Sequence, residues 1–91
     1  MPTFNQLVRS GTSIGANVSE SEQAQSKADF ISKLCIALKE AYETRYWLKL
    51  LSATGDITHE NAKRLLPMAD EIIRILVKSI KTAKSSDNRE K

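Results

Sequence analysis

The sequence predicts an all-α protein, an up-and-down helical bundle built as one domain. The strongest signal lies between Asp29 and Leu51, where apolar residues recur at steps of three and four, as on the buried face of an amphipathic helix. These positions are Phe30, Leu34, Ala37, Ala41, Leu48 and Leu51, with one gap at position 44, where the residue is Thr44. Helix-forming residues dominate the 91-residue chain, which has only 3 Gly and 2 Pro. No segment is predicted to be a strand.

A second, partial apolar stripe runs beside the first on this central helix. It consists of Ile31, Cys35, Leu38 and Tyr42. Two adjacent stripes indicate a wide buried face, as expected for a helix packed between two or more others. Cys35 is the single cysteine, and we expect it to be a small buried hydrophobe.

The first helix is predicted over residues 4–18. Its stripe consists of Phe4, Leu7, Gly11, Ile14 and Val18, and Thr3 could cap it. Gly11 and Gly15 lie one turn apart, and each costs a helix roughly 1 kcal/mol relative to alanine. The close approach of another helix backbone would offset this cost, because glycine has no Cβ. The alternative is that the helix breaks at one of the two glycines.

The central helix has clear end signals. Residues 19–27 are polar and predict a connector, within which Ser26 begins a capping box with Asp29. The helix is predicted over residues 27–53, and Gly55 ends it in a left-handed conformation. Such a short link makes the central and last helices an antiparallel hairpin.

The last helix begins after Thr58, a good N-cap residue. Its apolar positions are Ala62, Leu65, Leu66, Ala69, Ile72, Ile73, Leu76, Val77 and Ile80. The pattern continues on both sides of Pro67, which predicts a kink and not two separate helices. Residues 1–84 are therefore expected to form the helical-bundle domain, and residues 85–91, which have no apolar side chain, a flexible tail.

The positive charge is concentrated in the last helix. The chain has a formal net charge of +3, and residues 58–91 carry all of this excess. Arg74, Lys78, Lys81 and Lys84 lie at steps of four, three and three, so they fall on one side of the helix. Such a ridge can bind nucleic acid through its phosphates without reading sequence. The alternative is a solvated face that suits the helix dipole. No aromatic residue is interleaved with these cations, as base stacking would require.

The aromatic residues Tyr42, Tyr46 and Trp47 lie on the central helix instead. Tyr46 and Trp47 point away from its main stripe, so one partner helix cannot bury all three. Together with Leu50 they predict a second contact surface, for another subunit.

The sequence favours a protein that is not an enzyme. The single histidine, His59, is expected to be a surface residue, and no pattern of ligands predicts a metal or cofactor site. Glu40 and Glu43 lie on one helix face, but no Glu-x-x-His pair accompanies them, so we expect a salt-bridged interface network. No apolar run of about 18 residues predicts a membrane span. No signal peptide is evident, which favours the cytoplasm.

Three segments resemble the four-helix bundle family of 23S ribosomal RNA intervening-sequence proteins. They are QLVRSGTSIGANVSE (6–20), SKADFISKLCIALKEAYETRYWLKLL (26–51) and ADEIIRILVKSIKTAK (69–84). Residues that match the family pattern are Arg9, Ser13, Ile14, Asn17, Glu20, Lys39, Glu40, Glu43 and Trp47. The family is similar to accessory variability proteins of diversity-generating retroelements. The resemblance implies a bacterial, cytoplasmic, non-enzymatic protein that assembles as a ring-like homopentamer and has no assigned biochemical role.

Members of this family usually have a further helix before the RSGTSIGAN segment. The chain then supplies three helices of a four-helix bundle, a long antiparallel hairpin plus a shorter N-terminal helix. We expect the groove that this further helix would fill to be uncovered, and the chain to depend on self-association or on a partner helix. The candidate interface residues are Arg9, Gly11, Gly15, Asn17, Glu40, Glu43, Tyr46, Trp47 and Leu50.

Two functions remain as hypotheses. The first is a non-catalytic, oligomeric protein that binds nucleic acid, in particular RNA, through Arg74, Lys78, Lys81 and Lys84. The second is a protein–protein interaction or scaffold module whose charges only keep it in solution.

Overall fold

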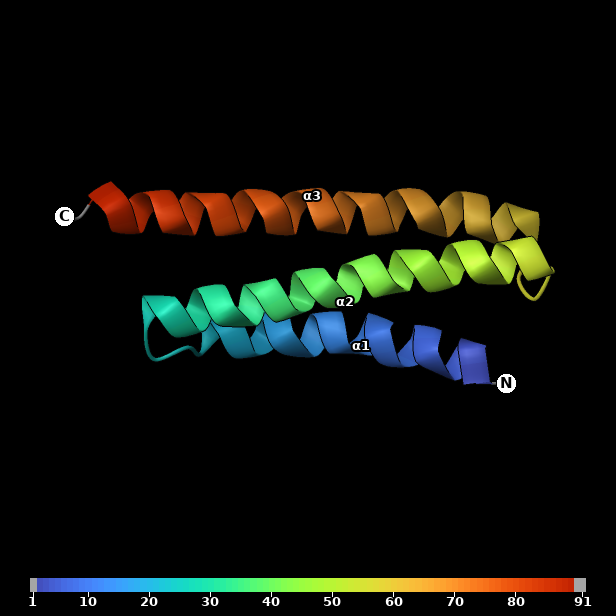
Figure 1. Ribbon diagram of the computed structural model, residues 1–91, viewed down its shortest axis with the longest axis horizontal. Coiled ribbons are helices and arrows are strands. Elements are labelled where there is room, and N and C mark those ends of the chain that lie inside the picture. The colour runs from blue at the N-terminus through green and yellow to red at the C-terminus, as the bar shows by residue number, and fades with distance from the viewer. Residues whose placement is uncertain (1, 90–91) are drawn as a thin grey trace.

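A computed structural model describes residues 2–89, and within them every regular element is a helix. The elements are α1 (Pro2–Glu22), α2 (Lys27–Thr54) and α3 (His59–Arg89). They lie side by side in an elongated body of 51 × 20 × 14 Å, with α2 between α1 and α3 in the view of Figure 1. The predicted all-α, up-and-down bundle is confirmed.

The predicted end signals of α2 and α3 are confirmed. Ser26 Oγ accepts a hydrogen bond from the Asp29 backbone N–H at 3.0 Å, which caps α2. Gly55 has φ 79° and ends the helix, and its N–H donates to the carbonyls of the last turn. Thr58 Oγ1 accepts from the Asn61 N–H at 3.0 Å. These caps fix the tight turn that makes α2 and α3 antiparallel.

The first helix is longer than predicted, and the connector is shorter. α1 continues to Glu22, so the first four residues of the polar stretch 19–27 are helical. Ser21 explains part of this extension, because it is 3% exposed and its hydroxyl donates to the Val18 carbonyl at 2.6 Å. The prediction failed here because an apolar stripe cannot reveal a buried position occupied by serine.

The last helix runs through Pro67 without being divided. The prediction that the helix continues across the proline is therefore confirmed. α3 is described as far as Arg89, past the predicted start of the tail at Ser85. The last two residues, 90–91, lie outside the described residues.

The core forms where α3 lies against α2. Its buried cluster consists of Leu34, Ala37, Ala41, Ile73, Leu76 and Ile80. Ile14 and Val18 of α1 pack against this cluster and are partly buried. Five of the six residues in the predicted main stripe of α2 are buried, and the sixth, Phe30, is half-buried.

The buried face of α2 is narrower than predicted. Of the second stripe, Cys35 and Tyr42 are exposed, and Ile31 and Leu38 are half-buried. The expectation of a buried Cys35 is therefore wrong. The physical reason is that α2 packs against two helices on adjacent sides, and the rest of its surface faces solvent within the described chain.

Candidate nucleic-acid interface

The four predicted cations do lie on the exposed surface of α3. We call Arg74, Lys78, Lys81 and Lys84 the basic ridge, and all four are exposed. Arg74 pairs with Glu71, one turn earlier, so part of its charge is neutralised. Among the residues whose side chains are described (3–85), no ion pair is found for the three lysines of the ridge. Within that part of the chain, the ridge therefore offers three positive charges that no described acidic side chain compensates.

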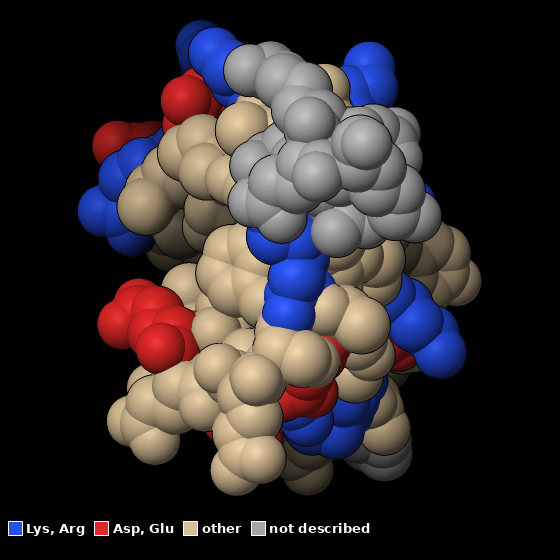
Figure 2. All heavy atoms as spheres, turned by 90° about the vertical axis from the view of Figure 1, so that its left-hand side faces the viewer, with Lys and Arg blue, Asp and Glu red and all other residues tan. Residues whose placement is uncertain are grey.

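The ridge is narrow. Seen end-on from the side where α3 ends, lysine and arginine atoms appear on both flanks of the bundle, with acidic atoms among them (Figure 2). Because acidic groups lie among the basic ones, the ridge is a local contact site for a polyanion and not part of a broad basic face.

A hollow with an apolar floor lies along the ridge. Its volume is about 440 Å³, and it is lined by Ile73, Arg74, Val77, Lys78 and Lys81. Ile73 is buried and Val77 half-buried, so these two form the floor while the three cations form the rim. The hollow can therefore contact an apolar group and a phosphate at the same time.

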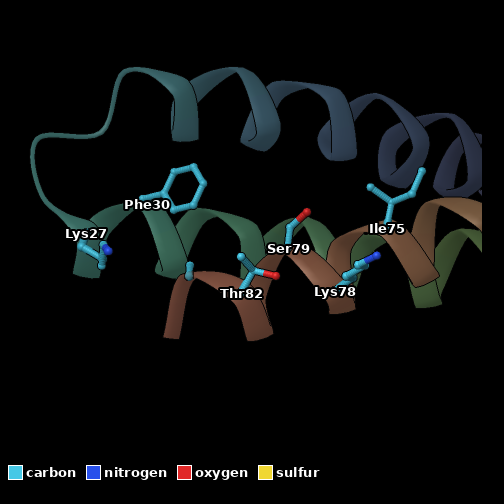
Figure 3. Close-up of a pocket in the computed structure, with 7 residues that line it drawn as sticks. Lys27, Phe30, Ile75, Lys78, Ser79 and Thr82 are labelled. Atoms are coloured by element: carbon cyan, nitrogen blue, oxygen red, sulfur yellow. The ribbon is translucent and has the colours of Figure 1, made fainter. Parts of the chain in front are cut away.

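Lys78 also borders a second hollow of about 540 Å³, at the N-terminal end of α2 (Figure 3). Phe30 of α2 and Ile75 of α3 both point toward α1 there. Ser79 and Thr82 of α3 add two hydroxyl groups to this hollow, beside Lys78.

This second hollow continues an apolar groove between α1 and α3. Two further hollows, of about 420 and 300 Å³, follow the groove along the bundle. We define the α1–α3 groove by the side chains and glycines that line it: Leu7, Gly11, Ile14, Gly15, Val18, Met68, Ile72 and Ile75. Met68 is 57% and Ile75 53% exposed, so the groove leaves large apolar side chains in contact with water.

The glycines of α1 do not approach another backbone within the described chain. Apart from the neighbouring part of α1 itself, no atom lies within 4 Å of where a Cβ on Gly11 or Gly15 would be, and both residues line the groove. The expectation of close packing is thus not met in the single chain, and α1 does not break at either glycine. The open space in front of them belongs to the α1–α3 groove.

Three of the candidate interface residues form an ion-pair cluster within the chain. Arg9 Nη1 lies 3.2 Å from Glu40 Oε2, and Arg9 Nη2 lies 3.4 Å from Glu43 Oε1. The predicted salt-bridged network therefore joins α1 to α2. Asn17 is also used locally, because its Nδ2 donates to the Ser13 carbonyl at 2.9 Å.

The aromatic candidates are divided between surface and interior. Tyr46 is 58% exposed, whereas Trp47 is half-buried and meets it edge to face with ring centroids 4.9 Å apart. Trp47 is covered in part because it lies one turn from Glu43, on the flank of α2 that carries Glu40 and Glu43 toward α1. Its Nε1 is buried and has no hydrogen-bond partner in the described chain. Leu50 is half-buried.

The structure also contains an interaction that sequence reasoning missed. Arg45 Nη1 lies 3.1 Å from Asp70 Oδ1 and joins α2 to α3, and the Arg45 guanidinium carbon lies 5.2 Å from the centre of the Tyr42 ring. The antiparallel hairpin was predicted, but the register that places these residues side by side is set by the core packing.

Two kinds of site are not found in the described residues. His59 is exposed at the start of α3, as predicted, and no group of three or more His, Cys, Asp or Glu residues there could hold a metal ion. None of the described helices combines the length and the hydropathy that crossing a bilayer requires.

Comparison with known proteins identifies the family. Residues 3–78 match the family described as 23S rRNA-intervening sequence protein. The chain belongs to this family. A comparison with curated proteins returns no match.

A solved structure of a related protein has the same fold as this chain. It is the 1.70 Å crystal structure of a protein of unknown function from the S23 ribosomal protein family of Bacteroides thetaiotaomicron. The two chains are 54% identical with a TM-score of 0.86, and the match covers 89% of this chain and 75% of the other. The family resemblance seen in the sequence is thus confirmed, and the function of the relative is described as unknown.

Proposed function

We propose that this protein is a non-catalytic nucleic-acid-binding protein that contacts RNA phosphates through the basic ridge of α3. The observation that carries the proposal is the row of exposed Lys78, Lys81 and Lys84, none of which is paired with a described acidic group. Unpaired cations at helical spacing attract a polyanion by releasing its counterions. The name of the family, which refers to ribosomal RNA, agrees with this choice of ligand.

We propose further that the protein works as a homo-oligomer. The support is the apolar surface that a single chain leaves in water, which includes Met68, Ile75 and Tyr46. Association of several copies would also place several narrow ridges in one particle, and linked sites bind a long polyanion much more tightly than one site does.

The proposal is tested by reversing two charges on the ridge. The double variant Lys78→Glu and Lys81→Glu should bind a fluorescently labelled RNA at least about tenfold more weakly at low salt, and its salt dependence should be shallower by about one unit per lost contact. The matched control is Lys63→Glu with Arg64→Glu, which makes the same charge change at the opposite end of α3, roughly 20 Å away at 1.5 Å per residue. Equal weakening in both variants would mean that only net charge matters, and would contradict a ridge site.

A specific observation also favours a second function, that of a protein–protein interaction module. The α1–α3 groove is apolar and open, as the exposed Met68 and Ile75 indicate. Light scattering with and without RNA separates the two functions. A multimer that takes up RNA at low salt and releases it at high salt supports nucleic-acid binding, whereas a multimer indifferent to RNA supports the interaction module.

A further inference from the structure

Tyr42 and the basic ridge lie on different helices, yet the fold places them at the same level of the bundle. The Arg45–Asp70 ion pair marks the register of α2 against α3, because it shows which residues of the two helices lie opposite each other. Tyr42 precedes Arg45 by one turn, and Arg74 follows Asp70 by one turn. Because α2 and α3 run in opposite directions (Figure 1), both steps lead the same way along the bundle. Tyr42 and Arg74 are therefore each displaced by one turn from the ion pair in the same direction. Because one turn keeps a residue on the same face of its helix, both lie on the side of the α2–α3 contact that carries the ion pair.

The Tyr42 ring is both accessible and held in place. Tyr42 is 44% exposed, and the Arg45 guanidinium carbon lies 5.2 Å from the centre of its ring. That guanidinium is itself bound to Asp70 at 3.1 Å. A cation held beside an aromatic ring attracts it electrostatically and restricts its motion. The ring is therefore preorganised, and little conformational entropy is lost when a ligand stacks on its exposed part.

The hollow on the ridge supplies the rest of the site. Its floor is Ile73 and Val77, and its rim carries Arg74, Lys78 and Lys81. Ile73 lies one residue before Arg74, so this floor begins at the level of Tyr42. Leu38, one turn from Tyr42 on α2, packs on the same core cluster as Val77. An apolar strip thus separates an exposed aromatic ring from a row of cations.

We infer that the nucleic acid bound here is single-stranded, with one base stacked on Tyr42 and the adjacent phosphates on Arg74, Lys78 and Lys81. This inference rests on the proposed function and specifies its ligand. Stacking on aromatic side chains beside a positive groove is how proteins hold single strands without reading sequence. In a duplex the bases stack on one another, so Tyr42 would gain no base and only the phosphate contacts would remain.

The test compares a labelled single-stranded oligouridylate, roughly 12 nucleotides long, with an RNA duplex of equal length by fluorescence anisotropy at low salt. Tyr42→Leu should weaken single-strand binding roughly 10- to 100-fold and leave duplex binding unchanged. Tyr42→Phe should keep most of the single-strand affinity, because the ring remains. Tyr46→Leu is the matched control, since Tyr46 is also an exposed tyrosine of α2 but lies one turn further from the ridge hollow.

The outcomes distinguish this inference from the proposed function. If wild type and Tyr42→Leu bind the single strand equally well, or if the duplex binds as tightly as the single strand, the inference is overturned while ridge binding stands. If neither RNA binds at low salt, the proposed function fails and the inference fails with it. Circular dichroism of each variant checks that the helices remain, as expected for substitutions at exposed positions.

Discussion

The two seams of α2 are held together by different chemistry. Toward α3, the seam is a cluster of buried aliphatic side chains, and its ion pair, Arg45–Asp70, is partly exposed. Toward α1, the seam contains the fully buried Ser10 and the Arg9 ion-pair cluster. Thr44 Oγ1 donates to Ser10 Oγ at 3.0 Å across this second seam. A small buried hydroxyl lets two helices approach closely, whereas large aliphatic groups supply more burial energy. The α2–α3 seam should therefore contribute most of the stability, and the α1–α2 seam most of the directional contacts.

The largest expected effect comes from the aliphatic seam. Leu76→Ala removes a side chain that is 5% exposed and leaves a cavity in the core cluster. We expect the free energy of unfolding to fall by about 2–4 kcal/mol. Urea denaturation followed by circular dichroism measures this loss, at one fixed protein concentration because association adds to apparent stability. A loss below about 1 kcal/mol would mean that this seam is not the main source of stability.

A smaller effect is expected from the hydroxyl pair between α1 and α2. Ser10→Ala should cost about 1 kcal/mol, because it removes the acceptor of Thr44 at a buried site. Thr44→Val serves as the partner variant, and the double variant completes a cycle that isolates the coupling between the two residues. If the two losses simply add, the hydroxyl contact does not stabilise the packing of α1 on α2.

A change of the opposite sign is expected on the side of α1 that lines the α1–α3 groove. Gly15→Ala should stabilise the isolated chain by roughly 0.5–1 kcal/mol, because the added Cβ meets no atom within 4 Å apart from the neighbouring part of α1 and alanine favours the helix. Gly55→Ala is the contrasting variant, since its φ of 79° disfavours any side chain, and it should lose about 1–2 kcal/mol. Thermal unfolding of both variants tests the pair. Destabilisation by Gly15→Ala would indicate that another backbone occupies the groove in solution.

The smallest effect should come from the partly exposed charges of the α1–α2 seam. The Arg9 side chain is 48% exposed, so Arg9→Ala should cost no more than about 1 kcal/mol. The loss should shrink further at high salt, where exposed ion pairs are screened. Urea denaturation at two salt concentrations measures it, with Glu43→Gln as the partner variant. A salt-independent loss above about 2 kcal/mol would mean that the cluster is effectively buried.

The difference between the seams also explains which features the sequence could predict. Helix ends depend on local chemistry, so Ser26, Gly55 and Thr58 were identified correctly as caps. The aliphatic stripe of α2 could be predicted equally well, because the spacing of its apolar residues depends on the sequence of one helix alone. Ser10 and Ser21 were not identified as buried residues, since a polar side chain in a close helix contact has no periodic signature.

The candidate site was predictable only in part. The basic ridge follows from spacing on one helix, and all four of its cations are exposed as expected. Tyr42 was assigned to the buried face, because its spacing from Leu38 and Cys35 continues an apolar stripe. Its place beside the ridge depends on the register of α2 against α3. The spacing of residues within one helix gives no information about that register.

Within the described chain, the close backbone contacts are those of α2 with α1 and of α2 with α3, while Ile14 and Val18 of α1 reach the core cluster that α2 and α3 share. The molecule is therefore two helical hairpins that share one helix, and each hairpin is a potential unit of local opening. Detachment of α1 would expose Ile14 and Val18 while leaving the α2–α3 hairpin paired. Amide protons of α1 should then exchange with solvent before those of α2. Such a transient opening of α1 would leave the basic ridge of α3 intact and would expose additional apolar surface. Nucleic-acid binding would then not require this opening, whereas self-association could use the surface that it exposes.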